Sequence, residues 1–119
     1  MFDKLRQLLE KLSAIFDEAT VDDDRVLQKE NTATLFVDEI TPQPLTFQRK
    51  RYTGKFAVMF SFKGSGMDVY DVADQKIDEI ETACDEVFSE YSFSRLHFSY
   101  VRNLSRLFVM IEMTTSWEE

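Results

Sequence analysis

The 119-residue sequence has few of the residue types that most often build chemical sites: one cysteine, one histidine, three glycines and two prolines. A single cysteine excludes an internal disulfide, and Cys84 falls on an apolar helical stripe, so we expect a reduced core thiol. One histidine, His97, and one distant cysteine match no recognised spacing of zinc ligands. The sequence therefore predicts no metal site.

Long hydrophobic runs are also missing. Charged residues interrupt the N-terminal segment MFDKLRQLLEKLSAIF, so we expect neither a signal peptide nor a membrane span there. The net charge of −8 argues against a general nucleic-acid binder and against attraction to an anionic membrane. We therefore expect a protein of the cytoplasm with no membrane partner.

Signals for catalysis or for a cofactor are weak. No nucleophile-elbow sequence accompanies His97. The glycine-containing turn Gly64-Ser65-Gly66 is followed by Asp68 and Asp71, which would repel a phosphate, and no Walker lysine follows it. The rim of an active-site cleft would be expected to contain glycines, and the sequence has three in all. We predict a non-enzyme with no catalytic residues and no cofactor.

The stretch Met67 to Tyr91 predicts one long amphipathic helix around which the rest of the chain is arranged. It carries nine acidic residues and one lysine, a net charge of −8, so the rest of the chain sums to zero. Such a face either repels an anion or binds a basic partner, although a merely solvated helix face explains it equally well. The apolar stripe consists of Val69, Ala73, Ile77, Ile80, Cys84, Val87, Phe88 and Tyr91.

The remaining patterns predict a single α+β domain over residues 1–119. An N-terminal amphipathic helix covers residues 1–19, strands fall within 34–62, the long helix spans 67–91, and a C-terminal hairpin covers 93–114. The expected fold is one antiparallel sheet of four to five strands in the order α-β-β-α-β-β, packed by the long acidic helix. The fifth strand would lie around Leu45 to Gln48.

Local signals place the connections. Thr20 to Asp24 is expected to be a solvated linker, because its three aspartates lack the alternation and the glycine of a calcium loop. Pro42 and Pro44 lack backbone donors, so the chain should turn or form a sheet edge there. Residues 114–119 are expected to be a short polar tail.

The only basic cluster lies between the expected strands. It comprises Arg49, Lys50 and Arg51, with Lys55 nearby. The cluster is short for a nucleic-acid patch, so a contact with another subunit or partner and a solvated turn both remain open.

The order of elements, the segment RYTGKFAVMFSFK (Arg51 to Lys63), the acidic helix after it and the ending LFVMIEMTTSW (Leu107 to Trp117) resemble a phage tail terminator, or tail-completion protein. The resemblance covers about Thr34 to Trp117 and concerns pattern and order.

This resemblance implies a structural virion protein, assembled in the host cytoplasm and located in the tail. It implies a homo-oligomeric ring, typically a hexamer of about six copies, that caps the tail tube protein and joins it to the head-tail connector protein. Genomic DNA would pass through without specific binding. The basic residues Arg49, Lys50, Arg51 and Lys55 would contact carboxylates of the next subunit. The acidic face would line the lumen or meet a partner, and it consists of Asp71, Asp74, Asp78, Glu81 and Asp85.

Two other functions remain open. An acidic inhibitor that mimics DNA would use the charge density of the helix, although the other elements sum to neutral. An adaptor would use the N-terminal helix as a binding stripe, but Leu5, Leu9 and Leu12 are more simply explained as covering the sheet.

Overall fold

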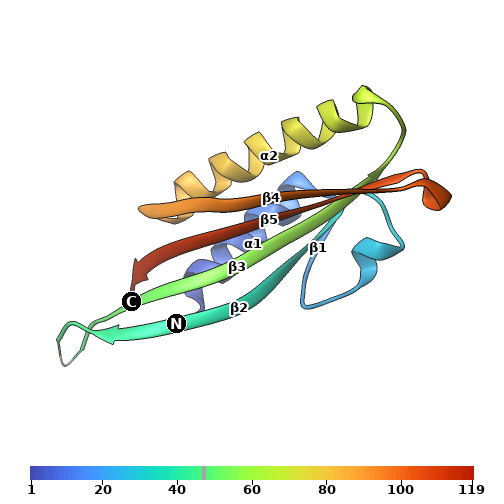
Figure 1. Cartoon of the computed structure of the whole chain (residues 1–119). Coiled ribbons are helices and arrows are strands. Elements are labelled where there is room, and N and C mark those ends of the chain that lie inside the picture. Colours follow the sequence, from blue (N-terminus) through green and yellow to red (C-terminus); the bar gives the residue numbers. More distant parts are fainter. Residues whose placement is uncertain (47) are drawn as a thin grey trace.

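The computed structural model describes residues 1–46 and 48–119 and forms one five-stranded sheet with two helices (Figure 1). The strand order is β1-β2-β3-β5-β4. The α+β class is confirmed, but the sheet is mixed, because β1 pairs in parallel with β2 whereas the other pairs are antiparallel. The elements are α1 (Asp3–Ile15), β1 (Glu18–Val21), the 3-10 turn η1 (Arg25–Leu27), β2 (Thr32–Pro44), β3 (Lys50–Lys63), α2 (Met67–Val87), β4 (Glu90–Val101), the 3-10 turn η2 (Arg102–Leu104) and β5 (Arg106–Glu118).

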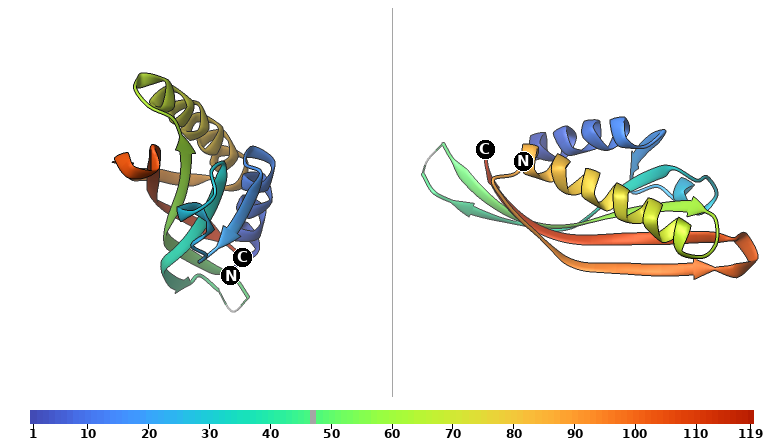
Figure 2. Two further views of the ribbon diagram at one scale, coloured as in Figure 1. Left: turned by 90° about the vertical axis from the view of Figure 1, so that its right-hand side faces the viewer. Right: turned by 90° about the horizontal axis from the view of Figure 1, so that it is seen from above.

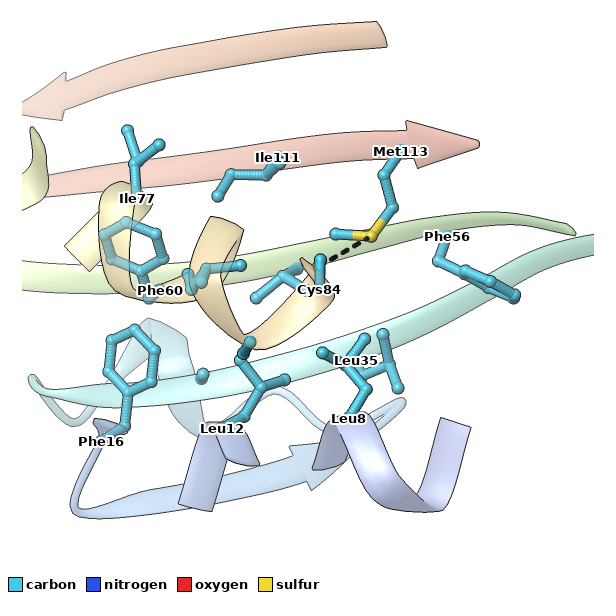
Figure 3. Packing of buried hydrophobic residues seen from close by; sticks show 14 of the residues in the cluster. Leu8, Leu12, Phe16, Leu35, Phe56, Phe60, Ile77, Cys84, Ile111 and Met113 are labelled. Atoms are coloured by element: carbon cyan, nitrogen blue, oxygen red, sulfur yellow. Dashed lines mark hydrogen bonds between the residues drawn. The ribbon is translucent and has the colours of Figure 1, made fainter. Parts of the chain in front are cut away.

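Both helices lie on the same face of the sheet and contact each other (Figure 2). The core between them is apolar, and its centre brings Leu12 and Phe16 from α1 and the turn after it against Phe60 of β3 (Figure 3). The rings of Phe16 and Phe60 lie 5.3 Å apart. The molecule is elongated, with extents of 54 × 22 × 22 Å.

The spacing of apolar residues predicts α2 well. Its buried residues are Val69, Ala73, Ile77, Ile80, Ala83, Cys84 and Val87, so seven residues follow the three-and-four spacing of one helix face. The helix ends at Val87, four residues earlier than predicted. Phe88 has an extended backbone and is itself buried, and Tyr91 already belongs to β4.

The N-terminal helix is also shorter than predicted, since α1 ends at Ile15. Residues Glu18–Val21 form β1, which pairs with β2 from Glu18 opposite Thr32 to Val21 opposite Leu35. The expected linker therefore begins only after Val21. The order of elements becomes α-β-β-β-α-β-β, and the additional strand lies at 18–21.

The prolines of β2 lie on a sheet edge. Pro42 pairs opposite Tyr52 and Pro44 opposite Lys50, but β1 covers β2 only as far as Leu35. Beyond that point β2 has no neighbour on its other side within the described residues, so an edge proline need not break a ladder. Of the two predicted alternatives for this segment, a turn or a sheet edge, the structure shows the sheet edge. The strand expected around Leu45 to Gln48 is wrong for Leu45, Thr46 and Gln48, which lie in the loop, and Phe47 lies outside the described residues.

The C-terminal hairpin is longer than predicted. The turn between its strands is η2, and Ser105 adopts a left-handed backbone with φ 47°. β5 is interior to the sheet, between β3 and β4, as its apolar residues on both faces predict. The predicted polar tail is wrong, because β5 continues to Glu118 and buries Trp117 against Tyr52, at 5.6 Å between ring centres.

Candidate functional site

The strongest charged feature of the surface is a row of carboxylates on α2. Within Met67–Val87 there are eight acidic residues and Lys76, so the helix carries −8 + 1 = −7, and Glu90 of the predicted helix lies in β4 instead. We call five of these residues the acidic stripe, because they follow one another at spacings of three and four along one exposed side: Asp71, Asp74, Asp78, Glu81 and Asp85.

The acidic stripe carries no neutralising cation. Within residues 1–46 and 48–119 the carboxylates of α2 that form ion pairs are Glu79, whose partner Lys76 is 3.5 Å away, and Glu86, whose partner is Lys11 of α1. Both lie outside the stripe, on the side of the helix turned toward α1. The five stripe carboxylates therefore repel one another, and no ion pair within the described chain offsets this repulsion.

One side of the stripe faces β4. The Tyr91 hydroxyl, at the start of β4, donates to the Asp85 carboxylate at 2.5 Å and also lies 3.2 Å from the Glu81 carbonyl oxygen. At the other end of α2 the ring of Tyr70 packs 6.1 Å from that of Phe98 on β4. Desolvation, and then the bond to Asp85, raise the pKa of the Tyr91 phenol above its ordinary value.

The predicted basic cluster lies at the end of the β2–β3 hairpin, which we call the arm; β5 pairs with β3 as far as Arg51, and the loop between β2 and β3 extends past the end of β5 (Figure 1). The structure gives three of its four cations a partner within the chain. Arg49 pairs with Glu118, Arg51 with Glu90 at 2.6 Å, and Lys55 with Glu39 at 3.6 Å. Lys50 is exposed and forms no ion pair within the described residues. Such exposed pairs are each worth about 0–1 kcal/mol, so another carboxylate can compete for these cations.

The two predicted sets of charges meet at one place. Arg51 of the arm and Asp85 of the acidic stripe line the same hollow of about 490 Å³ at the C-terminal end of α2, together with Lys4 and Trp117. The other members of the stripe lie along the helix away from this hollow.

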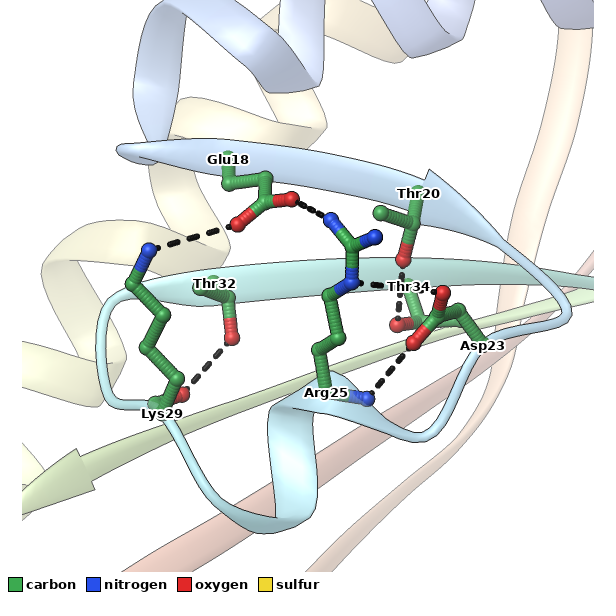
Figure 4. A network of polar contacts seen from close by, with 7 residues as sticks. All are labelled: Glu18, Thr20, Asp23, Arg25, Lys29, Thr32 and Thr34. Carbon is green, nitrogen blue, oxygen red and sulfur yellow. Dashed lines mark hydrogen bonds and ion pairs between the residues drawn. The ribbon is translucent and has the colours of Figure 1, made fainter.

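A polar network missed by sequence reasoning holds the segment between β1 and β2 (Figure 4). Arg25 pairs with Glu18 and also with Asp23, whose carboxylate accepts the Arg25 backbone N–H at 2.8 Å. Lys29 approaches Glu18 from the other side at 3.4 Å. Hydrogen bonds from Arg25 and then Lys29 lower the pKa of the partly exposed Glu18 carboxyl below its ordinary value. Asp23 of the predicted linker thus serves a structural contact, and no cluster suited to a metal occurs among the described residues.

The sheet face opposite the helices is partly covered. At one end, η1 inserts the buried Val26, whose carbonyl oxygen accepts the Ser61 hydroxyl at 2.9 Å. Arg106 donates to the Leu27 carbonyl oxygen at 3.0 Å and seals the same end. The rest of this face carries a hollow of about 640 Å³. Half-buried apolar side chains line it: Phe36, Ala57 and Met110.

The single histidine and the single cysteine, two residue types often used in catalysis, lie in different surroundings. His97 is exposed on β4 beside Arg95, 3.4 Å away. Cys84 is buried, its sulfur lies 4.0 Å from that of Met113, and burial, reinforced by Asp85 and Glu81, raises the pKa of its thiol to about 12. No helix among the described residues is long and apolar enough to span a membrane.

Comparisons with known proteins find a likeness among solved structures. No protein-family model matches the sequence, and no curated protein matches it. Among solved structures, a chain of the "Virion of native gene transfer agent (GTA) particle" is similar over 98% of this chain and 92% of that chain, at 7% identity and a TM-score of 0.47. Function is therefore argued from the surfaces of this chain itself.

Proposed function

We propose that the protein is a non-enzymatic structural component of a phage-like virion that assembles as a ring in the manner of a tail terminator. The observation that carries the proposal is the separation of charge: five exposed carboxylates on α2 form no ion pair within the described chain, while the end of the β2–β3 hairpin carries the basic cluster. A ring built head to tail requires two unlike surfaces on each copy, and this chain has them.

In this proposal the arm of one copy contacts carboxylates of the next. Arg49 lies in the loop at the tip of the β2–β3 hairpin, and Lys50 and Arg51 are the first residues of β3 beside it. Their ion pairs within the chain are exposed and weak, so exchanging them for pairs with a neighbouring copy costs little. The charges would set the register of assembly more than its affinity.

We assign Asp71 and Asp78, the outward members of the acidic stripe, to the lining of the channel through which DNA would pass. Counted around the helix, they lie farther from β4 than Asp74, Glu81 and Asp85. A lumen lined by carboxylates offers phosphates no cations, so DNA passes without being retained. The ring would cap a tail tube and join it to a head-tail connector.

The proposal is tested by the size of the protein in solution at high concentration, measured by light scattering and negative-stain imaging. The wild type should form rings of about six copies. The double variant Arg49→Glu/Lys50→Glu should remain folded and fail to form rings. Its matched control is Lys63→Glu/Arg102→Glu, which reverses two cations at the opposite end of the sheet and should leave the rings intact.

Three outcomes would overturn the ring: a wild type that stays monomeric at every concentration and yields no chemical cross-links beyond a dimer, an arm variant that still forms rings, or a control that loses them as well. A compact monomer that binds a basic nucleic-acid enzyme tightly would instead favour the inhibitor that mimics DNA. Against that alternative, α2 carries a net charge of −7 out of the −8 of the whole chain, whereas acids and bases nearly balance over the other elements.

A further inference from the structure

The two edges of the sheet differ in how well they are protected from pairing. On one edge, β1 covers the start of β2, and the rest of β2 contains a bulge between Val37 and Glu39, followed by Pro42 and Pro44. These features discourage the addition of another strand. On the other edge, β4 contains no proline, and within the described residues nothing pairs with its outer side.

The regular part of this open edge is long enough to accept a strand. After a bulge between Phe93 and Arg95, the pairing of β4 with β5 runs without interruption from Arg95 to Val101. Seven residues are about the length of an ordinary strand. The backbone groups on the outer side of this segment are therefore free to form a further ladder.

The same edge exposes apolar side chains on the face that carries the helices. Leu96 and Phe98 are 44% and 41% exposed, although their cross-strand neighbours Ile111 and Val109 are fully buried. Tyr70 of α2, 36% exposed, packs beside Phe98 and forms the inner wall. The result is an apolar shelf between α2 and the β4 edge, defined by Tyr70, Leu96 and Phe98.

Carboxylates along the side of α2 that faces β4, from the shelf toward the start of β4 at Tyr91, determine what fits on this edge. On α2, Asp74, Glu81 and Asp85 share the side of Tyr70, and the bond from Tyr91 to Asp85 shows that this side faces β4. Lysine or arginine side chains of an added strand would lay their methylene groups over Leu96 and Phe98 and bring their charges to these carboxylates. Alternate side chains of the strand would point to the other face.

We propose that the β4 edge binds an extended basic segment of a partner protein by strand addition, with lysine or arginine at every second position facing α2. A second copy of this chain fits poorly. Pairing β4 with β4 would bring two acidic stripes together, and the exposed part of β2 carries Asp38, Glu39 and two prolines. The inference does not depend on the ring, because it requires only the monomer.

The first experiment uses the full-length protein and a fluorescent peptide of about eight residues in which lysine and valine alternate. Binding is measured by fluorescence anisotropy at low and high salt. The triple variant Asp74→Asn/Glu81→Gln/Asp85→Asn should weaken binding roughly tenfold, since three exposed charge pairs together contribute about 1.4 kcal/mol. The control Glu10→Gln/Asp17→Asn/Asp24→Asn removes the same charge at other exposed positions and should leave binding nearly unchanged.

The second experiment separates strand addition from attraction by charge alone. Two peptides are N-methylated at alternate residues, one at the lysines and one at the valines, so that each loses the backbone donors of one edge. Strand addition should abolish binding of one methylated peptide and spare the other. Hydrogen exchange should show new protection of amides within Arg95–Val101.

The proposal is overturned if the parent peptide does not bind at low salt, if both methylated peptides bind as well as the parent, or if the control variant loses as much affinity as the stripe variant. New protection confined to elements other than β4 would overturn it too. The variant Leu96→Ser/Phe98→Ser, checked for folding by circular dichroism, should bind the parent peptide more weakly, because the apolar shelf is lost.

Discussion

The Tyr91 hydroxyl donates a hydrogen bond to the Asp85 carboxylate at 2.5 Å and thereby joins the start of β4 to the last turn of α2. The contact bridges the turn at Phe88 and Ser89, where the chain reverses from helix to edge strand. It also fixes the side of α2 that faces the β4 edge.

Replacing this tyrosine tests the contact directly. Tyr91→Phe keeps the ring, which packs 5.7 Å from Phe93, and removes the hydrogen bond to a charged acceptor. We expect a loss of about 1 kcal/mol in the free energy of unfolding, at the lower end for such bonds because the site is partly exposed. Urea denaturation near neutral pH measures it.

The same variant has a predicted pH dependence. The pKa of Tyr91 is raised in the folded state above its ordinary value of 10.0, so the folded protein holds this proton more tightly than the unfolded chain. The advantage of the wild type over Tyr91→Phe is therefore fully present below pH 10.0 and is lost as the pH rises toward the folded-state value. An advantage that grows with alkaline pH would contradict the contact.

Much of the fold could be predicted from periodicity alone. The alternation at Phe56, Val58 and Phe60 predicts β3, and the stripe from Val69 to Val87 predicts α2, because one buried face imposes its period on the sequence. β1 could not be found in this way. Ala19 continues the helical stripe of α1, and only the non-local pairing of Glu18–Val21 with β2 makes the segment a strand.

In the candidate site too, local features could be predicted from the sequence, and contacts between distant residues could not. The acidic stripe is visible in the sequence because its spacing is local to one helix. The partners of the basic cluster are not, since Arg49 pairs with Glu118 and Arg51 with Glu90, residues far along the chain that only the sheet brings near. Trp117 was missed for a similar reason, because its burial depends on Tyr52 and Phe56 of another strand.

Gly54 is required by close packing beneath two rings. A Cβ at this position would lie 2.4 Å from the Phe56 ring and 2.9 Å from that of Trp117, and both rings are buried. We expect Gly54→Ala to lower the free energy of unfolding by about 1–3 kcal/mol, as overpacking of a filled core does. The neighbouring exposed substitution Thr53→Ala should cost less, about 0.5 kcal/mol. Equal midpoints for the two variants in chemical denaturation would refute the packing argument.

Glu18 should contribute to stability only while it is ionised. Its pKa is lowered in the folded state by Arg25 and Lys29, so the folded protein binds this proton less readily than the unfolded chain. The stabilisation is present above the ordinary pKa of 4.5 and is lost as the pH falls through the lowered value. Wild type and Glu18→Gln should thus differ in unfolding free energy near pH 7 and converge in acid and at high salt. A difference that persists in acid would mean that the side chain acts through packing instead.

The acidic stripe should keep DNA from adhering to the protein. Asp71→Lys/Asp78→Lys replaces two exposed carboxylates on the outward side of α2. It changes none of the buried apolar residues of the helix, so the fold should persist. We expect the variant to bind DNA with an affinity that falls steeply with salt, whereas the wild type binds none in a gel-shift assay. A variant that still fails to bind DNA at low salt would show that these two positions do not control access of phosphates to the surface.

Cys84 should report on unfolding through its reactivity. The thiol is fully buried, and its pKa of about 12 leaves almost no thiolate near neutral pH. A thiol reagent should therefore label the native protein only as fast as it unfolds, and labelling should accelerate in urea in step with the loss of helical circular dichroism. The raised pKa also means that folding stability declines as the pH rises above the ordinary value of 9.0. The variant Thr82→Cys in a Cys84→Ala background is the control, because its thiol lies on the exposed side of α2 and should react at once. Equally fast labelling of wild type and control in the absence of urea would place Cys84 outside the core.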